Sequence, residues 1–314
     1  MIARVTCFRH IRNSILTELK IGFAGVQMIR LQIFSALILI NLAAPLAVAT
    51  SSDAATPAPA AGMKLVFSED FDGTALDTTK WFAGPKPEGD SGQWGGAYFV
   101  KQDDPRFKSV YHVEDGKLRI RAFHDPNFQD PSRWGRKWYS GQISSAFPGG
   151  RVTGAARKGY FVARMKMPDN PGAWSAFWML NTQSINKALG KGAVEIDVVE
   201  AYGHDRLNYM ATIHDWKEQG KSDGAERNTS GRLRGANLTT GYHDYAALVT
   251  DKEVVWYFDD IEIFRHPLYR ADDFTMGKFF VLLDLAISQD WPVKIPENGQ
   301  IDLFIDSVQI YSAD

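Results

Sequence analysis

The stretch AVEIDVVEAYG, residues 193–203, places three carboxylates within six residues of an otherwise apolar β-strand pattern. Side chains at i and i+2 of a strand share one face, so Glu195 and Asp197 point to the same side of the strand. Glu200 has the opposite parity and would face the core of a regular strand. Burying several unpaired charges so close together is costly. This strand therefore needs a chemical reason to carry them.

The segments around this strand repeat the two-residue period. In KLRIRAF, Leu118, Ile120 and Ala122 alternate with basic residues, as on a half-buried strand. EVVWYFDDIEIF, residues 253–264, predicts a hairpin with Asp259-Asp260 as its turn. Further strand-length runs bounded by turn residues are GYFVARMKM at 159–167, NYMATIH at 208–214, DYAALVT at 244–250, FFVLLDLAI at 279–287 and IDLFIDSVQIY at 301–311.

Many strands without long helical periodicity predict an all-β fold, with two packed antiparallel sheets in a sandwich or jelly roll. No change in composition divides residues 64–314, so we predict one domain there. Segments 84–110, 124–139, 181–193 and 215–240 are rich in Gly, Pro and charged residues, which predicts long loops.

The N-terminal region is typical of a secretory signal. From Met28 the order is a basic residue, an apolar run broken by polar residues, and small residues up to Ala49, where we expect cleavage. The apolar run is short for a membrane span, which is the alternative interpretation. Residues 1–49 are thus predicted to be an N-terminal region that holds this signal, with the start at Met28, and 50–63 to be a linker. We expect a secreted or periplasmic protein that does not stay in the membrane.

The remaining composition narrows the possible partners. The net charge of −2 favours neither nucleic acid nor an anionic membrane surface. Cys7, the single cysteine, precedes the predicted cleavage site, so the mature chain would lack disulfides and thiol chemistry. No histidine spacing is typical of catalytic zinc. We expect no cofactor for catalysis and a monomer.

A β-bulge around Val198-Val199 would bring Glu200 back beside Glu195 and Asp197. Two carboxyl groups brought within about 5–5.5 Å support retaining glycoside hydrolysis, with one ionised as nucleophile and one protonated as acid. Their mutual repulsion keeps the acid protonated. Two alternatives remain open: a solvent-facing strand with ordinary charges, and a calcium site built from the clustered carboxylates.

At these residues the sequence resembles glycoside hydrolase family 16. EIDVVE, residues 195–200, matches the bulged form of that family's signature, Glu-x-Asp-x-x-Glu. The likeness extends over most of the mature chain, through FSEDFDGTALDTTKW at 67–81, SGQISS at 140–145, GAWSAFWML at 172–180 and FIDSVQIY at 304–311.

The resemblance implies a β-jelly-roll with a concave substrate cleft, acting on a β-linked polysaccharide. It implies that Glu195 is the nucleophile, Asp197 its helper and Glu200 the acid/base, as in laminarinases, agarases and carrageenases. It also implies a possible structural calcium, for which Asp70 and Asp306 are candidates. Ser288-Gln289-Asp290 replaces a Gly pair that many members carry before Trp-Pro, which leaves the substrate open.

Aromatic rings stack on sugar rings, so tryptophans near the carboxylates are candidate substrate contacts. Trp174 and Trp178 are four residues apart on one predicted strand, hence on one face. His214 could hydrogen-bond a sugar hydroxyl or Asp197. Core packing is the alternative for the tryptophans, and Trp81 and Trp256 are expected in the core. Further candidates from loop-like stretches are Trp94, Trp138, Trp216 and Trp291.

These observations predict a secreted, retaining endo-β-glycosidase that hydrolyses a β-glucan or galactan. A transglycosylase uses the same residues and passes the sugar to another sugar. A non-catalytic carbohydrate-binding protein on the same fold is the second alternative.

Overall fold

The computed structural model describes residues 56–87, 93–185, 193–216, 227–271 and 276–314. The predicted signal, residues 1–49, lies outside the described residues. Within them, no helix combines the length and apolarity that crossing a bilayer requires.

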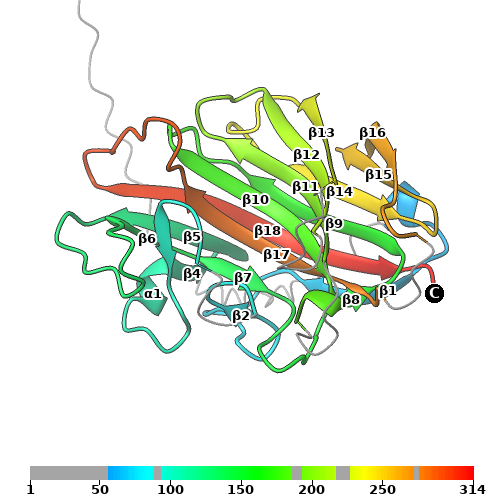
Figure 1. Cartoon of the computed structure of the whole chain (residues 1–314), viewed down its shortest axis with the longest axis horizontal. Helices are drawn as coiled ribbons and strands as arrows, with labels where there is room; N and C mark the ends of the chain where they lie inside the picture. Colours follow the sequence, from blue (N-terminus) through cyan, green and yellow to red (C-terminus); the bar gives the residue numbers. More distant parts are fainter. Residues whose placement is uncertain (1–55, 88–92, 186–192, 217–226, 272–275) are drawn as a thin grey trace, which may run out of the picture. The chain divides into compact units, whose positions relative to one another are not determined.

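Two sheets account for the fold (Figure 1). The first has ten strands, in the spatial order β16 (Ile261–Pro267), β15 (Glu253–Phe258), β14 (His243–Val249), β9 (Gly159–Lys166), β18 (Gln300–Ser312), β5 (Lys117–His124), β6 (Trp138–Ser140) and β3 (Ala97–Phe99), with β1 (Lys64–Glu69) beside β18 and β4 (Tyr111–Glu114) beside β5. The second has eight strands, in the order β13 (Arg227–Arg234), β12 (Asn208–Asp215), β11 (Val194–Tyr202), β10 (Ala173–Asn181), β17 (Phe279–Ile287), β7 (Gln142–Ser144) and β2 (Phe82–Ala83), with β8 (Ala155–Ala156) beside β17.

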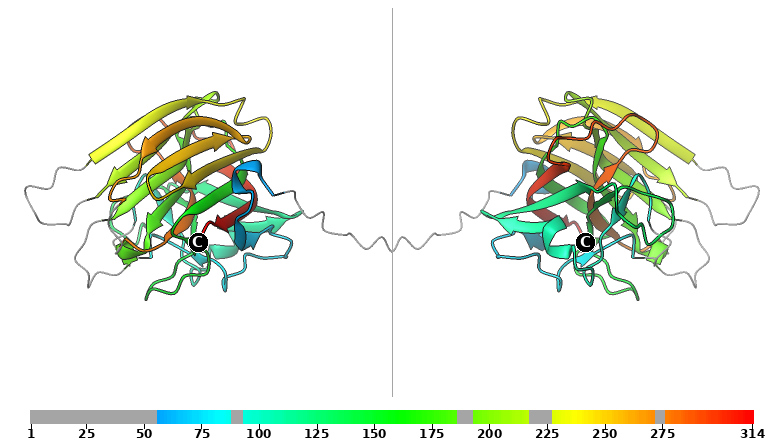
Figure 2. Two further views of the ribbon diagram at one scale, coloured as in Figure 1. Left: turned by 90° about the vertical axis from the view of Figure 1, so that its right-hand side faces the viewer. Right: turned by 90° about the vertical axis from the view of Figure 1, so that its left-hand side faces the viewer.

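Neighbouring strands are antiparallel except β3 and β6, which run parallel. The helical segments among the described residues are short: η1 (Ala58–Ala60), α1 (Phe107–Val110) and η3 (Thr182–Ile185). The predicted all-β fold of two packed sheets is confirmed (Figure 2).

The strand predictions from alternation hold in detail. Leu118, Ile120 and Ala122 are fully buried on β5. Asp259 and Asp260 both have positive φ, 48° and 63°, as a two-residue turn between twisted strands requires. The predicted hairpin of β15 and β16 is therefore confirmed.

Segments predicted to be irregular contain some regular structure. The end of the predicted linker 50–63 packs on the domain, because Ala60 of η1 is buried against Tyr160 and Tyr311. The predicted loop 215–240 contains β13, whose sequence RNTSGRLR lacks apolar alternation. β13 lies at the edge of its sheet, where one hydrogen-bonded neighbour suffices to form a strand without a buried face.

One core lies between the sheets. It joins Ile196 and Val198 from β11 to Tyr245 and Trp256 from the ten-stranded sheet. Because these β11 side chains face the core, the alternate side chains of the same strand face away from it. The outer face of the eight-stranded sheet is thus the surface on which the carboxylates lie.

Candidate active site

A β-bulge turns Glu200 to the face of its two acidic neighbours. Along β10, Phe177 pairs with Val199 and Trp178 pairs with Asp197, so Val198 has no partner on β10. Along β12 the register also shifts between Asp197 and Glu200. The bulge predicted around Val198-Val199 is confirmed.

The bulge is anchored from the opposite sheet. Trp256, fully buried on β15, donates its indole N–H to the backbone carbonyl of Asp197 at 2.9 Å. A bulge interrupts the regular ladder, and this bond gives the Asp197 carbonyl a partner inside the core. The core therefore helps to fix the conformation on which the position of Glu200 depends.

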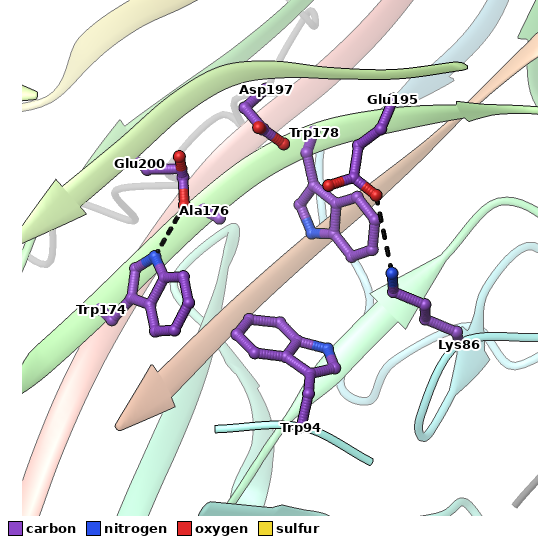
Figure 3. A pocket seen from close by; sticks show the side chains of 8 residues that line it. All are labelled: Lys86, Trp94, Trp174, Ala176, Trp178, Glu195, Asp197 and Glu200. Atoms are coloured by element: carbon purple, nitrogen blue, oxygen red, sulfur yellow. Dashed lines mark hydrogen bonds and ion pairs between the residues drawn. The ribbon is translucent and has the colours of Figure 1, made fainter. Parts of the chain in front are cut away.

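All three carboxylates line one pocket of about 180 Å³, shown in Figure 3. Its other walls are Lys86, Trp94, Trp174, Ala176 and Trp178. Glu195 is 8% exposed and Asp197 4%, so neither acid is a freely solvated surface group. The alternative of a solvent-facing strand with ordinary charges is excluded for them.

The environment of Glu200 raises its pKa. Burial and the neighbouring carboxylates Asp197 and Glu195 raise its pKa to about 8, against the opposing effect of Trp174. The Trp174 indole N–H donates to Glu200 Oε1 at 3.1 Å. Glu200 is consequently protonated at neutral pH, the state that a proton donor needs.

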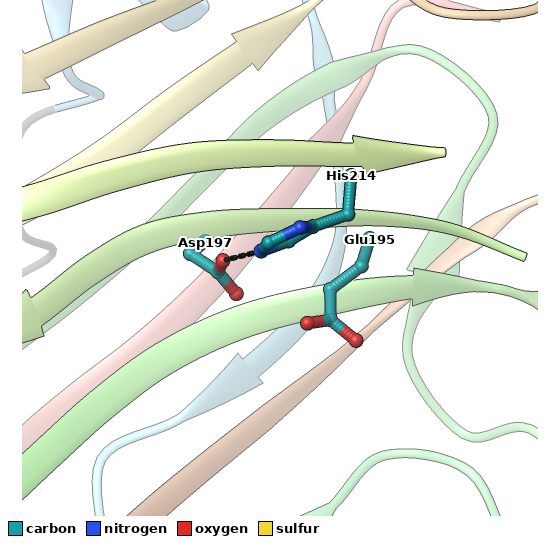
Figure 4. Close-up of side chains that lie close together, drawn as sticks. All are labelled: Glu195, Asp197 and His214. Carbon is teal, nitrogen blue, oxygen red and sulfur yellow. Dashed lines mark ion pairs between the residues drawn. The ribbon is translucent and has the colours of Figure 1, made fainter. Parts of the chain in front are cut away.

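Asp197 lies between the two glutamates in sequence and is paired with a histidine (Figure 4). Burial and the charge of Glu195 raise the Asp197 pKa to about 6. His214 Nε2 lies 3.2 Å from Asp197 Oδ2 and opposes this rise. The contact predicted between His214 and Asp197 is present.

Glu195 faces a cation that the sequence did not single out. Lys86 Nζ lies 3.5 Å from Glu195 Oε2 and 4.8 Å from the centre of the Trp178 ring. The ammonium group thus places a positive charge beside the Glu195 carboxylate. Lys86 precedes no recognisable motif, so only the folded chain could reveal this contact.

A second missed residue lies beneath the pocket. Asp284 of β17 is fully buried and accepts a hydrogen bond of 2.7 Å from the Trp178 indole N–H. Burial raises the pKa of Asp284 well above its ordinary value. The lone acid within the apolar run FFVLLDLAI was a signal that could have identified it.

Glu195, Asp197 and His214 offer three ligand atoms within 4.8 Å of one another, a metal-like grouping among the described residues. Calcium prefers six to eight oxygen ligands, and this group supplies two carboxylates and an imidazole. Lys86 adds a positive charge beside Glu195. The residues at the carboxylate strand therefore fit calcium poorly.

The predicted aromatic contacts separate into three groups. Trp94, Trp174 and Trp178 line the pocket. Trp291 packs on Trp174, with ring centres 6.0 Å apart, and Trp216 stacks on His214 at 4.8 Å. Trp291 thus lies next to a pocket residue, and Trp216 lies next to His214, which contacts the pocket residue Asp197. Neither tryptophan lines the pocket itself, and their contact with sugar stays a prediction.

Trp138 is a correction. It was expected in a loop near the substrate, and it lies on β6, 6% exposed, in the core and beside His124. Its indole is used for packing, because β6 adds to the ten-stranded sheet, whereas the pocket lies on the eight-stranded one. Trp81 and Trp256 are fully buried, as predicted.

The calcium predicted at Asp70 and Asp306 stays a prediction. Burial raises the pKa of Asp70, and the charges of Asp72, Glu69 and Asp306 add to the rise. The carboxylates of Asp70 and Asp306 therefore interact. Asp306 also lies 3.5 Å from Lys117 Nζ and 3.6 Å from Arg164 Nε. A bound cation would compete with both basic groups.

Comparison with known proteins identifies the family. The family model described as Beta-porphyranase A-D, GH16 domain, matches residues 64–302. The chain belongs to glycoside hydrolase family 16. Among curated members, the endo-1,3-1,4-beta-glycanase EglC of Rhizobium meliloti is 30% identical over 79% of this chain and 51% of its own length. The beta-glucanase of Rhodothermus marinus is 27% identical over 79% of this chain and 85% of its own length.

Solved structures of family 16 share the fold. The laminarinase from Rhodothermus marinus superposes with a TM-score of 0.60 at 23% identity, covering 80% of this chain and 97% of that one. LamAcat from Zobellia galactanivorans gives 0.62 at 23% identity, covering 79% and 97%. These likenesses confirm the β-jelly-roll. This family-16 chain spans 29%, 51% and 30% of the first three curated relatives it matches.

The pKa of Glu200 predicts the basic side of the pH profile. Activity that needs protonated Glu200 falls as pH rises through about 8. Trp174→Phe removes the N–H that stabilises ionised Glu200, so its pKa rises and the basic limb of kcat/KM moves to higher pH. Trp291→Phe, which alters a neighbour of Trp174 that is not bonded to Glu200, is the control. If the basic limb stays in place in Trp174→Phe, the pKa of Glu200 does not set it.

Proposed function

We propose that this chain is a retaining endo-β-glycosidase that hydrolyses a β-linked polysaccharide by double displacement. The observation that carries the proposal is the bulge at Val198, which puts a protonated Glu200 into the same pocket as Glu195. Pure carbohydrate binding does not require an acid and a nucleophile in one pocket.

In the first step, a carboxylate oxygen of Glu195 forms a bond to the anomeric carbon. The bond from that carbon to the glycosidic oxygen breaks, and the oxygen takes the proton of Glu200. Glu195 is then an uncharged ester. Its charge no longer raises the Glu200 pKa, so Glu200 stays ionised more readily and can act as a base.

In the second step, water gives a proton to Glu200 and its oxygen bonds to the anomeric carbon as the ester bond breaks. Glu195 leaves as a carboxylate, and Lys86 lies where it stabilises that returning charge. Asp197, held by His214, lies between the two glutamates along the strand, and its charge contributes to the raised Glu200 pKa. The new hydroxyl keeps the β-configuration.

A β-1,3- or mixed β-1,3-1,4-glucan is the substrate class that the curated relatives favour. EglC and ExsH of Rhizobium meliloti carry the name endo-1,3-1,4-beta-glycanase. A porphyran-type galactan is the second candidate, supported by the matching family model and by the beta-porphyranase E of Zobellia galactanivorans, 31% identical over 46% of this chain. We further propose a monomer that is secreted or periplasmic, through the signal predicted before residue 50.

Product stereochemistry tests the mechanism. On laminarin, lichenan and porphyran, proton NMR during the first minutes should show β-anomeric product on whichever polymer is cleaved. An initial α-anomer would refute the covalent intermediate. Longer products on adding oligosaccharide would identify a transglycosylase, and binding without any cleavage would identify a carbohydrate-binding protein.

A further inference from the structure

Asp284 is a buried acid that takes no part in the two displacement steps. It lies on β17 with no exposed surface, and its Oδ1 accepts the indole N–H of Trp178 at 2.7 Å. Its other oxygen, Oδ2, has no hydrogen-bond partner among the described residues. A buried carboxylate oxygen without a donor costs free energy. A proton on Oδ2 would remove that cost by making the oxygen a donor.

A second acceptor without a partner lies on the neighbouring strand. Gln142 of β7 is also fully buried, and its Oε1 has no hydrogen-bond partner within the described part of the chain. Its Nε2 donates to the carbonyl oxygen of Gly84 at 3.2 Å. That contact sets the orientation of the amide, because turning it over would put Oε1 against another acceptor. Oε1 therefore needs a donor from a different group.

The strand register places Asp284 directly opposite Gln142. The two residues pair across β17 and β7. Directly paired residues share one face of the sheet, with Cβ atoms about 4.5–5.5 Å apart, which both side chains can bridge. Two acceptor oxygens cannot bond to each other, whereas one proton between them satisfies both in a single O–H···O bond.

The surroundings of Asp284 favour its protonated form. Burial raises its pKa well above the ordinary value, and hydrogen bonds from Trp178 and a backbone amide oppose the rise. Among the described residues, the titratable groups that interact with it are Glu200, Lys86 and Tyr111. Glu200 adds to the rise when it is ionised, and Lys86 opposes it. Burial raises the pKa of Tyr111, so this hydroxyl stays neutral.

We propose that Asp284 carries a proton, donates it in a hydrogen bond to Gln142 Oε1, and is a positioning residue for Trp178 and for the segment that bears Lys86. Trp178 is bonded to Asp284, and Gly84 is bonded to Gln142 through both its amide N–H and its carbonyl. Lys86 follows two residues after Gly84, and its ammonium lies over the Trp178 ring (Figure 3). One proton thus joins two walls of the catalytic pocket. The inference rests on the proposed function and adds a positioning residue to it.

Infrared spectroscopy detects the proton directly. A protonated carboxyl group has a C=O stretch that a carboxylate lacks, and labelling of aspartate with carbon-13 separates Asp284 from Glu200. At a pH well above the Asp197 pKa of about 6, the wild-type protein should keep a labelled acid band that Asp284→Asn loses. Gln142→Leu should shift the band, because the O–H loses its acceptor. A band that is absent from the wild type, survives in Asp284→Asn or stays unmoved in Gln142→Leu would overturn the inference.

Activity shows whether the link positions the pocket. Asparagine at position 284 keeps an acceptor for Trp178 and an N–H for Gln142, so kcat/KM on the cleaved polysaccharide should stay within about twofold. Asp284→Leu removes both contacts and should lower kcat/KM of folded protein by about tenfold, the loss typical of one good polar contact. Ser145→Ala is the control: its buried hydroxyl accepts the Val281 amide of the same strand. This variant should lower the melting temperature without changing kcat/KM.

The pH profile separates a neutral Asp284 from a charged one. A charged Asp284 would raise the pKa of Glu200, so Asp284→Asn would move the basic limb of kcat/KM to lower pH. A neutral Asp284 leaves that limb where the wild type has it. A shift to lower pH, or full activity in folded Asp284→Leu, would overturn the inference. Both the band and the limb are read in Asp284→Asn, whose amide fills the same space. A wild-type protein inactive on every polysaccharide would refute the proposed function, while the infrared band would still test the proton on Asp284.

Discussion

Glu195→Gln and Glu200→Gln should each remove nearly all hydrolysis of the polysaccharide, while the protein keeps its fold. The amide preserves the size of each side chain. Glutamine at position 195 cannot attack the anomeric carbon, and glutamine at position 200 has no proton of suitable acidity. General acid catalysis alone contributes about 10²–10⁴-fold, and we expect a loss of at least about 10³-fold for the nucleophile variant.

The two variants should differ on a substrate with an activated leaving group. A glycosyl fluoride needs little protonation, so its first step survives Glu200→Gln and fails in Glu195→Gln. Azide can replace a missing carboxylate in variants that shorten one of the two glutamates to alanine. Azide replacing the Glu200 base gives a β-glycosyl azide, and azide replacing the Glu195 nucleophile gives an α-glycosyl azide, which assigns each role separately.

Glu69→Gln is the matched control. Glu69 and Glu195 are both 8% exposed, but Glu69 lies away from the pocket and accepts hydrogen bonds from the Phe71 amide and Trp81. Its loss should change the melting temperature more than the turnover of folded protein. If either catalytic variant turned over a verified substrate at nearly the wild-type rate, double displacement by these residues would be wrong.

Trp256 should show the largest effect on stability. It is fully buried between the sheets, and Trp256→Ala would leave a cavity costing about 3–5 kcal/mol of unfolding free energy. Trp256→Phe keeps most of the volume and removes the indole N–H. The carbonyl of Asp197 then loses its partner, at a cost of about 1–3 kcal/mol.

Trp256→Phe should also lower kcat, because loss of this hydrogen bond allows the bulge to shift and Glu200 to move. Denaturant unfolding measures the stability, and turnover is compared at equal amounts of folded protein. Trp81→Phe is the control: Trp81 is equally buried and also donates its indole N–H, but to Glu69. It should lose stability without loss of turnover. If Trp256→Phe and Trp81→Phe changed turnover equally, Trp256 would contribute to the core without a specific effect on the bulge.

The positions of some tryptophans could be predicted from the sequence, and those of others could not. Trp174 and Trp178 could be placed on one face because strand parity is a local property. Trp138 could not be placed, since whether a short segment joins the ten-stranded or the eight-stranded sheet depends on pairings far along the chain. β13 was missed for the same reason, because an edge strand with polar residues has no local signature.

The local sequence was enough to determine the all-β fold, the positions of the strands with alternating apolar residues, and the three acids of the EIDVVE stretch, including the need for a bulge. Those features depend on backbone parity and on the cost of burying charge, which neighbouring residues already express. Only the tertiary structure decided that Lys86 faces Glu195, that Asp284 holds Trp178 and that Trp256 anchors the bulge. Each of these contacts joins residues distant in sequence, and the energy that selects them arises only when both sheets are packed.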